Sequence, residues 1–354
     1  MKVAMYPYES VDNQYLNLIK VSIKELNLEI NSFEKVISNK ELFGETDYYL
    51  FNWYESFYTD SRRKQSIEFT KRILKLIKLK LYRKKIIWTV HNKIPHDSKR
   101  VFLSKVLMKF LANNSNNIII HSNETRNVLA ELTNYKKIKN KIVYIPHPNY
   151  IGAYNVNEDI KKYDNKKLNL LFVGRIQPYK NVDLLIKVFK ELNFDDVTLT
   201  IAGKPSGEEY KTYINNLIGD NSNIRSILRF IEDDELPQLM LKSDMLVLPY
   251  DIKSSLNSGT IILAFSNKRT VLSPLIGTLK DFDRNQFFAY EYTDEISHEK
   301  ELKKNLIEIV NLYRSNKNII ENMGRNCYEI VKVENSSERV ADIYKNKIFT
   351  EENK

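Results

Sequence analysis

The feature that most constrains the fold is an alternation of short apolar runs with amphipathic segments, which occurs in both halves of the chain. Strands are predicted in the first half for KVAMYP, YYLFNW, KKIIWTV, NIIIHS and KIVYIP, and in the second half for LNLLFVG, VTLTIAG, IRSILRF and MLVLPY. Helices are predicted between them, for example in DLLIKVFKEL and EEYKTYINNLI. Continuous apolar strands that alternate with helices are typical of parallel sheets covered on both faces. The sequence therefore predicts an α/β protein with two Rossmann-like, doubly wound domains that face each other.

The expected boundary between these domains lies in a polar stretch near residues 152–167. We expect one domain over residues 1–160 and a second over residues 161–334. A chain of 354 residues suits two domains of ordinary size. Ligands of doubly wound sheets bind beyond the carboxyl ends of the strands, so the strand-end loops should carry the chemistry.

The cysteine content and the apolar runs indicate a cytoplasmic protein. Cys327 is the single cysteine, which excludes a disulfide framework and disfavours a cysteine-based metal site. The first residues have no long apolar stretch, and no run approaches the roughly 18 apolar residues of a membrane span. We therefore expect a protein that is neither secreted nor integral to the membrane.

Charge is distributed unevenly along the chain. Residues 1–167 carry 30 Lys/Arg and 17 Asp/Glu, whereas residues 168–354 carry 25 and 28. A basic half beside a near-neutral half indicates that attraction for a polyanion resides in the first half. That polyanion could be nucleic acid, an acidic glycan or an anionic membrane surface.

Two cations lie on the short loop FVGRIQPYKN, between a predicted strand and a predicted helix. Gly174 permits close approach of the backbone, and Arg175 and Lys180 supply a planar fork of donors and a point charge. This combination suits a diphosphate. The alternative is that both are solvated surface cations.

A second loop, YDIKSSLNSGTIILAF, follows the strand MLVLP and precedes a predicted buried helix. Ser258, Gly259 and Thr260 place hydroxyl and backbone N–H groups at the start of that helix, where an anion binds favourably. The alternative is a helix cap without a ligand.

The segment FVGRIQPYKNVDLLIKVF resembles the donor-binding segment of GT-B glycosyltransferases, most closely the large group of bacterial polysaccharide-assembly and sugar-lipid transferases (group 1, family 4-like). The resemblance covers nearly the whole chain. It implies that Arg175 and Lys180, behind Gly174, hold the diphosphate of a nucleotide-sugar, and that the N–H groups of Ser258, Gly259 and Thr260 hold it from the helix side. It further implies an acceptor-binding first domain joined by a C-terminal helix (335–354), and a donor-binding second domain. The nucleobase would lie near Arg229 and Ile231, and no metal or other cofactor would be required.

The sequence departs from this group at one place. Many members carry two Glu residues eight positions apart around the second turn, and alignment on Gly259 puts Leu256 and Ala264 at these positions. The ribose would then be held by the backbone or by Tyr250. The loss also weakens any inference that the sugar retains its configuration, and it is compatible with an inactive relative.

Candidates for a catalytic base lie in the basic half. The loop TVHNKIPHD contains His91, His96 and Asp97, and Glu55 follows another predicted strand. A base is required to remove the acceptor proton if the configuration inverts. We rank Asp97 and His96 with His91, followed by Glu55. A structural role is the alternative for each, and a metal site is disfavoured because carboxylates at ligand spacing are few.

A basic amphipathic stretch, Ser61 to Lys85, contains eleven Lys/Arg and one acid, Glu68. Such helices dock on anionic membrane faces. The alternative is a solvated helix whose apolar stripe faces the core. Nucleic acid is disfavoured because no recognised nucleic-acid motif accompanies the charge.

The sequence as a whole predicts a peripheral membrane enzyme on the inner face of the cell membrane. It would move a sugar from a nucleotide-sugar to a lipid-linked or growing glycan during cell-surface polysaccharide biosynthesis. A nucleotide-sugar epimerase is one alternative. A non-catalytic GT-B subunit that binds glycan or a partner transferase is the other.

Overall fold

The computed structural model describes residues 1–350 except 11–13, 58–60, 94–100 and 155–166. The chain divides into two compact units. The first comprises Met1–Pro148 and Asn335–Lys354, and the second comprises Asn149–Glu334. The division falls after Pro148, earlier than the expected boundary at residue 160.

Unit 1 is built on a six-stranded parallel sheet with the order β2-β1-β3-β4-β5-β6. The apolar runs of the sequence form five of these strands. The short β2 was not predicted, because only one of its four residues is apolar. The strands are β1 (Lys2–Tyr6), β2 (Glu29–Ser32), β3 (Tyr48–Asn52), β4 (Lys85–Val90), β5 (Asn117–Ile120) and β6 (Ile142–Tyr144).

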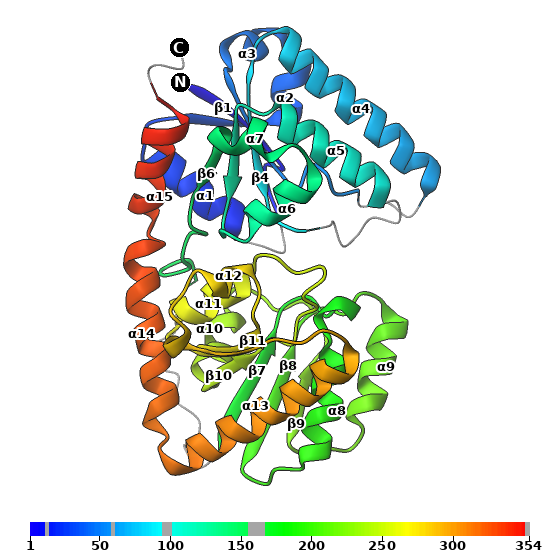
Figure 1. Ribbon diagram of the computed structural model, residues 1–354, viewed down its shortest axis with the longest axis vertical. Helices are drawn as coiled ribbons and strands as arrows, with labels where there is room; N and C mark the ends of the chain where they lie inside the picture. Colours follow the sequence, from blue (N-terminus) through cyan, green and yellow to red (C-terminus); the bar gives the residue numbers. More distant parts are fainter. Residues whose placement is uncertain (11–13, 58–60, 94–100, 155–166, 351–354) are drawn as a thin grey trace. The chain divides into compact units, whose positions relative to one another are not determined.

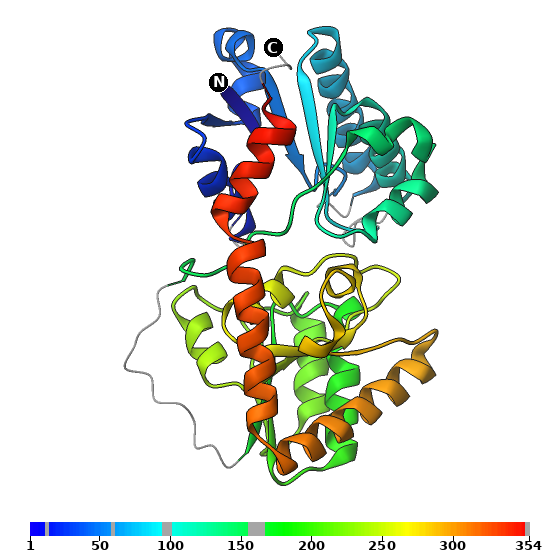
Figure 2. The same ribbon diagram turned by 60° about the vertical axis from the view of Figure 1, so that its left-hand side comes forward.

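Helices cover both faces of this sheet (Figures 1 and 2). On one face, α1 (Tyr15–Lys24) and the C-terminal α15 (Ser337–Ile343) pack together over apolar side chains of the strands. On the other face, α4 (Arg62–Leu81) and α5 (Val101–Asn114) lie side by side. The remaining helices of unit 1 are α2 (Phe33–Ser38), α3 (Lys40–Glu45), α6 (Thr125–Leu132) and α7 (Tyr135–Ile138).

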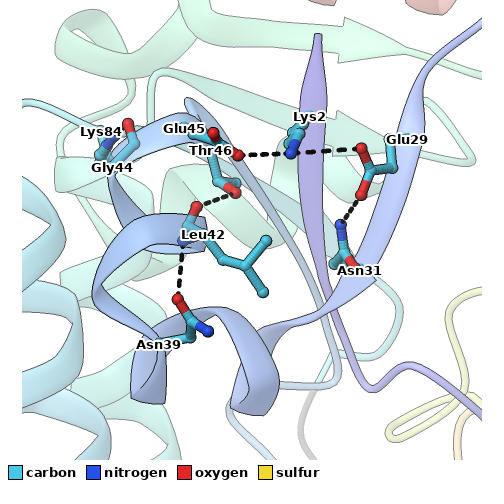
Figure 3. Close-up of polar contacts among 9 residues, drawn as sticks. All are labelled: Lys2, Glu29, Asn31, Asn39, Leu42, Gly44, Glu45, Thr46 and Lys84. Carbon is cyan, nitrogen blue, oxygen red and sulfur yellow. Dashed lines mark hydrogen bonds and ion pairs between the residues drawn. The ribbon is translucent and has the colours of Figure 1, made fainter.

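Polar contacts fasten the outer edge of this sheet. Lys2 at the start of β1 pairs with Glu45 at the end of α3, at 2.5 Å, and with Glu29 at the start of β2, at 3.5 Å (Figure 3). Asn39 caps α3 by accepting a hydrogen bond from the N–H of Leu42. These contacts are largely exposed and add little stability.

Unit 2 repeats the architecture with the order β12-β11-β10-β7-β8-β9, again all parallel. The four predicted strands are present, and β11 and β12 were not predicted. The strands are β7 (Leu168–Val173), β8 (Val197–Ala202), β9 (Ile224–Ile227), β10 (Met245–Val247), β11 (Thr270–Pro274) and β12 (Phe288–Tyr290).

The helices of unit 2 also cover two faces, with α13 packed on α8 and α14 packed on α11. The helix predicted for EEYKTYINNLI is α9 from its first residue to its last. The helices are α8 (Val182–Leu192), α9 (Glu208–Ile218), α10 (Glu235–Leu241), α11 (Gly259–Ser266), α12 (Gly277–Lys280), α13 (Glu295–Ser315) and α14 (Asn318–Glu334).

Each sheet has a topological switch point, where the strand order reverses. It lies between β1 and β3 in unit 1 and between β7 and β10 in unit 2. Ligands of doubly wound sheets bind at this point, outside the carboxyl ends of the strands. The two doubly wound units thus confirm the predicted fold class, and they direct attention to the loops after β1, β3, β7 and β10.

Candidate active site

The close approach of two glycines, Gly174 and Gly203, fixes the loop after β7. Gly174 has φ +127°, in the region that favours glycine, and its N–H donates to the carbonyl of Ala202. At Gly203, which has φ +149°, an added Cβ would lie 1.8 Å from the carbonyl oxygen of Gly174. Any side chain at Gly203 would therefore displace the loop that carries Arg175.

Lys180 returns to this loop from the short 3-10 helix Pro178–Lys180. Its Nζ lies 3.3 Å from the position that a Cβ on Gly174 would occupy, and the Thr260 hydroxyl lies 3.8 Å from it. A glycine at position 174 thus leaves open a space that an ammonium and a hydroxyl both border. The structure brings together three predicted residues from two different loops.

The charge of Lys180 is set by its surroundings. Burial, and to a lesser degree the charge of Arg175, lowers the pKa of Lys180 to about 8. Its ammonium also lies 5.4 Å from the ring centre of Tyr250. The Arg175 side chain is exposed. An incoming anion would favour the charged form of Lys180 and would be held by two cations.

The loop after β10 is tied to the first loop by two hydrogen bonds. The Asn181 amide donates to the carbonyl of Pro249 at 3.0 Å, and the N–H of Asp251 donates to the carbonyl of Tyr179 at 2.9 Å. Because these bonds join the strand ends on either side of the switch point, the two loops form one site.

Ser258 organises the start of α11. Its hydroxyl accepts from the N–H of Ile261 and donates to the Tyr250 hydroxyl, both at 3.3 Å. Its own N–H donates to the Thr278 hydroxyl at 2.8 Å, so this expected anion donor is used within the protein. The N–H groups of Gly259 and Thr260 lie in the first turn, where helical N–H groups have no intrahelical partner.

The predicted nucleoside residues lie in two places. Tyr250 is buried beside Ser258 and Lys180. Arg229 and Ile231 follow β9 at the sheet edge, where Arg229 makes a bidentate pair with Glu235, both distances being 2.6 Å. The hydrogen bonds from Arg229 hold the pKa of Glu235 at about 2. Among the described residues, no recorded contact joins Arg229 or Ile231 to the Lys180 site.

The two positions that lack the family carboxylates have apolar surroundings. Leu256 and Ala264 are both fully buried. Both positions therefore belong to the buried core of unit 2.

A second polar cluster lies at the strand ends of unit 1, around Tyr15. The Tyr15 hydroxyl donates to Nε2 of His121 at 2.9 Å, and Nδ1 of His121 donates to the carbonyl of Ile145 at 2.7 Å. The rings of His91, His121 and His147 lie 4.9, 5.4 and 5.1 Å from that of Tyr15. We call Tyr15 and these three histidines the histidine cluster.

His91 is the predicted candidate that belongs to this cluster. It stacks on Trp53 with ring centres 4.1 Å apart, and its Nε2 lies 3.1 Å from the amide oxygen of Asn52. An amide oxygen only accepts, so Nε2 carries the proton and Nδ1 is the acceptor nitrogen of the ring. Trp53 itself adopts φ +49°, a conformation uncommon for a bulky residue.

The histidine cluster is uncharged at neutral pH. Burial lowers the pKa of His121 to about 3 and that of His147 to about 4, and it holds the pKa of His91 well below its usual value. Proximity of the three rings adds to the shifts of His91 and His121, because each would repel a second imidazolium. The cluster offers neutral donors and acceptors instead of charge.

Glu55, the remaining described candidate for the base, has surroundings that differ from those of the histidine cluster. Its Oε2 accepts a hydrogen bond from the Trp88 indole at 3.1 Å, whereas its Oε1 is buried without a described partner. Burial raises the pKa of this carboxyl. The surroundings of Glu55 favour a proton on the carboxyl. His96 and Asp97 lie outside the described residues.

Sequence reasoning missed His121 and Tyr15. The signal for His121 was present, because it lies near the end of the predicted strand NIIIHS and directly follows β5. Tyr15 opens the first helix and reads as an ordinary apolar position. Only the fold brings it to the three histidines.

Comparisons with known proteins agree with this architecture. Residues 155–253 match the family described as glycosyl transferases group 1. A GDP-mannose:glycolipid 4-beta-D-mannosyltransferase of Xanthomonas campestris pv. campestris is 28% identical over 201 residues, 57% of this chain and 53% of that protein. An uncharacterized glycosyltransferase of Methanocaldococcus jannaschii is 26% identical over 250 residues, 70% of this chain and 63% of that protein. The chain thus spans about half the length of the Xanthomonas relative.

Solved structures share the fold over nearly the full length. HepE of Anabaena, in complex with UDP and glucose, has a TM-score of 0.72 at 13% identity, covering 97% of each chain. WaaG, a glycosyltransferase involved in lipopolysaccharide biosynthesis, has a TM-score of 0.63 at 12% identity, covering 98% of this chain and 100% of that one.

These findings relate the chain to one class of proteins. The fold is that of the GT-B proteins, and the matched segment contains the Gly174–Lys180 loop. Fold and family match together support a GT-B glycosyltransferase of group 1.

Proposed function

We propose that this protein transfers a sugar from a nucleoside-diphosphate sugar to a lipid-linked or growing glycan acceptor in cell-surface polysaccharide biosynthesis. The observation that carries the proposal is the convergence of Lys180, Thr260 and the open face of Gly174 at the switch point of unit 2. With Arg175 on the same loop, this site has the charge and the donors to receive a leaving diphosphate.

The names of similar proteins narrow the substrates in this proposal. The Xanthomonas relative is named for GDP-mannose and a glycolipid, and HepE was solved with UDP and glucose. GDP and UDP are therefore the first nucleotides to test, and a glycolipid is the first acceptor class. Such an acceptor would place the enzyme at the inner face of the membrane.

The diphosphate charge would be met by protein cations instead of a metal. Among the described residues, no group of three or more His, Cys, Asp or Glu side chains has the arrangement of a metal site. Arg175 and Lys180 supply two positive charges, which would stabilise the negative charge that the leaving diphosphate gains as the sugar–phosphate bond breaks.

His91 is the described candidate for the base that would deprotonate the acceptor. It is neutral at pH 7, as a base must be before it accepts a proton. Stacking on Trp53 and the bond to Asn52 fix the plane of its ring. His96 and Asp97 remain sequence candidates for the same role.

A non-catalytic GT-B subunit is the second candidate function. Leu256 and Ala264, both buried, stand where many members of the group place carboxylates. A protein with this role would bind glycan or a partner and would have no requirement for a diphosphate site.

Calorimetric titration of the whole chain with UDP, GDP, ADP and TDP, with CMP as a control, separates the two candidates. We expect one diphosphate to bind, and Arg175→Ala or Lys180→Ala to weaken it by about ten- to a hundredfold, since each removes charge-assisted hydrogen bonds. Lys187→Ala, on the exposed side of α8, is the matched control and should bind as the parent does. Absence of binding to all four diphosphates would favour the non-catalytic subunit.

A further inference from the structure

The side of α4 that faces away from the sheet of unit 1 carries several exposed apolar side chains. The helix buries Gln65, Arg72, Leu76 and Leu79 against the rest of unit 1. Ile67, Leu74 and Leu81 are instead 46%, 60% and 77% exposed. Residues seven apart lie nearly in line along a helix, so these three form one stripe about 20 Å long. These three side chains therefore do not face the core, whereas Leu76 and Leu79 do.

Cations border this stripe. Arg63 lies four residues before Ile67 and Lys71 lies four residues after it, and both are exposed. The helix has one acid, Glu68, whose carboxylate is paired with Arg72 at 3.0 Å. Arg72 in turn donates to the backbone carbonyl of Ser56 in the interior. The one negative charge of α4 is therefore drawn toward a buried partner.

The neighbouring helix α5 continues the pattern. It lies beside α4 in both views of the molecule (Figures 1 and 2). Phe102 and Val106, one turn apart, are 74% and 36% exposed, and Lys105 and Lys109 are exposed beside them. Neither helix places an unpaired acid among these side chains, and α5 contains no acid at all.

We propose that α4 and α5 form a docking surface for an anionic lipid bilayer. The apolar side chains Ile67, Leu74, Leu81 and Phe102 would enter the interfacial region, and the surrounding Lys and Arg would contact the phosphate headgroups. Apolar and cationic side chains on the same face match such a surface, because binding strength grows with both buried apolar area and electrostatic attraction. A nucleic acid would use the cations but not the exposed leucines.

The described helices are consistent with surface docking. None of them combines the length and the apolar composition needed to cross a bilayer. The docking surface extends the membrane-bound acceptor of the proposed function, yet it belongs to unit 1 alone and can be tested without transfer activity.

The test is flotation of the whole chain with phosphatidylcholine vesicles, with and without phosphatidylglycerol. We expect flotation only with the anionic vesicles. Leu74→Glu with Leu81→Glu, and separately Arg63→Glu with Lys71→Glu, should each weaken binding by about tenfold or more. All four residues are exposed, so the variants should fold, and equal thermal unfolding midpoints would verify this.

Matched controls come from α13 in unit 2. Ile296→Glu changes a side chain that is 82% exposed, and Lys300→Glu with Lys304→Glu reverses two exposed cations. Both should float as the parent does.

Three results would overturn the proposal. They are equal flotation with neutral and anionic vesicles, unchanged flotation of both α4 variants, and a dimer in sedimentation that the α4 variants dissociate while no flotation occurs. The last result would assign the surface to a second copy of the chain. Nucleotide titration of the same variants reports on the diphosphate site separately, so failure of one proposal is distinguishable from failure of the other.

Discussion

The two units use one topology to build strand-end sites of opposite electrostatic character. In unit 2, the loops at the switch point place the partly buried Lys180 and the exposed Arg175 around an open glycine. In unit 1, the corresponding sheet edge holds the buried and uncharged histidine cluster. The parallel sheet determines where a site lies, whereas the side chains that end each strand determine which ligand it suits. In the proposed function, the diphosphate would bind at the first site, and His91 of the second would deprotonate the acceptor hydroxyl.

The largest effect expected from this comparison is on turnover, through the neutral site. His91→Gln keeps hydrogen-bonding capacity but removes the titratable nitrogen, so transfer should fall by about 10²- to 10⁴-fold. Nucleotide affinity should stay within about twofold, because the diphosphate site is built from other residues. The measurement pairs a transfer assay with calorimetry. Normal turnover in this variant would exclude His91 as the base and leave His96 and Asp97.

An intermediate effect is expected on stability in acid. The pKa values of His121 and His147 are lowered to about 3 and about 4 in the folded chain, whereas unfolded histidine titrates near 6.5. The unfolded state therefore binds more protons as the pH falls below about 6.5, and the free energy of unfolding decreases. Each histidine contributes up to about 1.4 kcal/mol per pH unit until the pH reaches its folded pKa.

Chemical denaturation followed from about pH 7 to about pH 4.5 measures this loss. His121→Gln should have a smaller dependence on pH than the parent. An unchanged slope in that variant would show that His121 titrates normally in the folded chain.

The smallest effect concerns the charged site in alkali. Because the pKa of Lys180 is lowered to about 8, its charge is lost as the pH rises through this value in the unliganded protein. Diphosphate affinity should therefore decline above about pH 8, approaching tenfold per pH unit, since the ammonium is the binding form. Lys180→Arg stays charged and should flatten the profile. The same alkaline decline in Lys180→Arg would assign it to another group.

Much of the fold could be predicted because the apolar runs are long and regular. Nine of the strands are visible as such runs, since buried parallel strands are apolar on both faces. The short strand β2 has a mixed composition, and its pairing with β1 supplies what local sequence does not. Strand β12 has three residues, too few for any periodicity.

The site residues that could be predicted are those whose role depends on the residue types of their own loop. Gly174, Lys180 and Thr260 lie on loops whose residue types indicate anion binding, and the structure brings them together. The use of the Ser258 N–H by Thr278 could not be foreseen, because twenty residues separate them. The histidine cluster was missed for the same reason, as Tyr15 and His121 are 106 residues apart.

The division of unit 1 into two separate chain segments has a consequence for how the chain could be rebuilt. Unit 1 is interrupted after Pro148 and resumes at Asn335, and the Asn335 amide donates to the carbonyl of His147 at 2.7 Å. Unit 2 is thus an insert whose two ends leave the host at one point. Because the ends already touch, a few residues could replace the insert at low entropic cost. A short linker in place of unit 2 would therefore leave the chain path of unit 1 nearly unchanged.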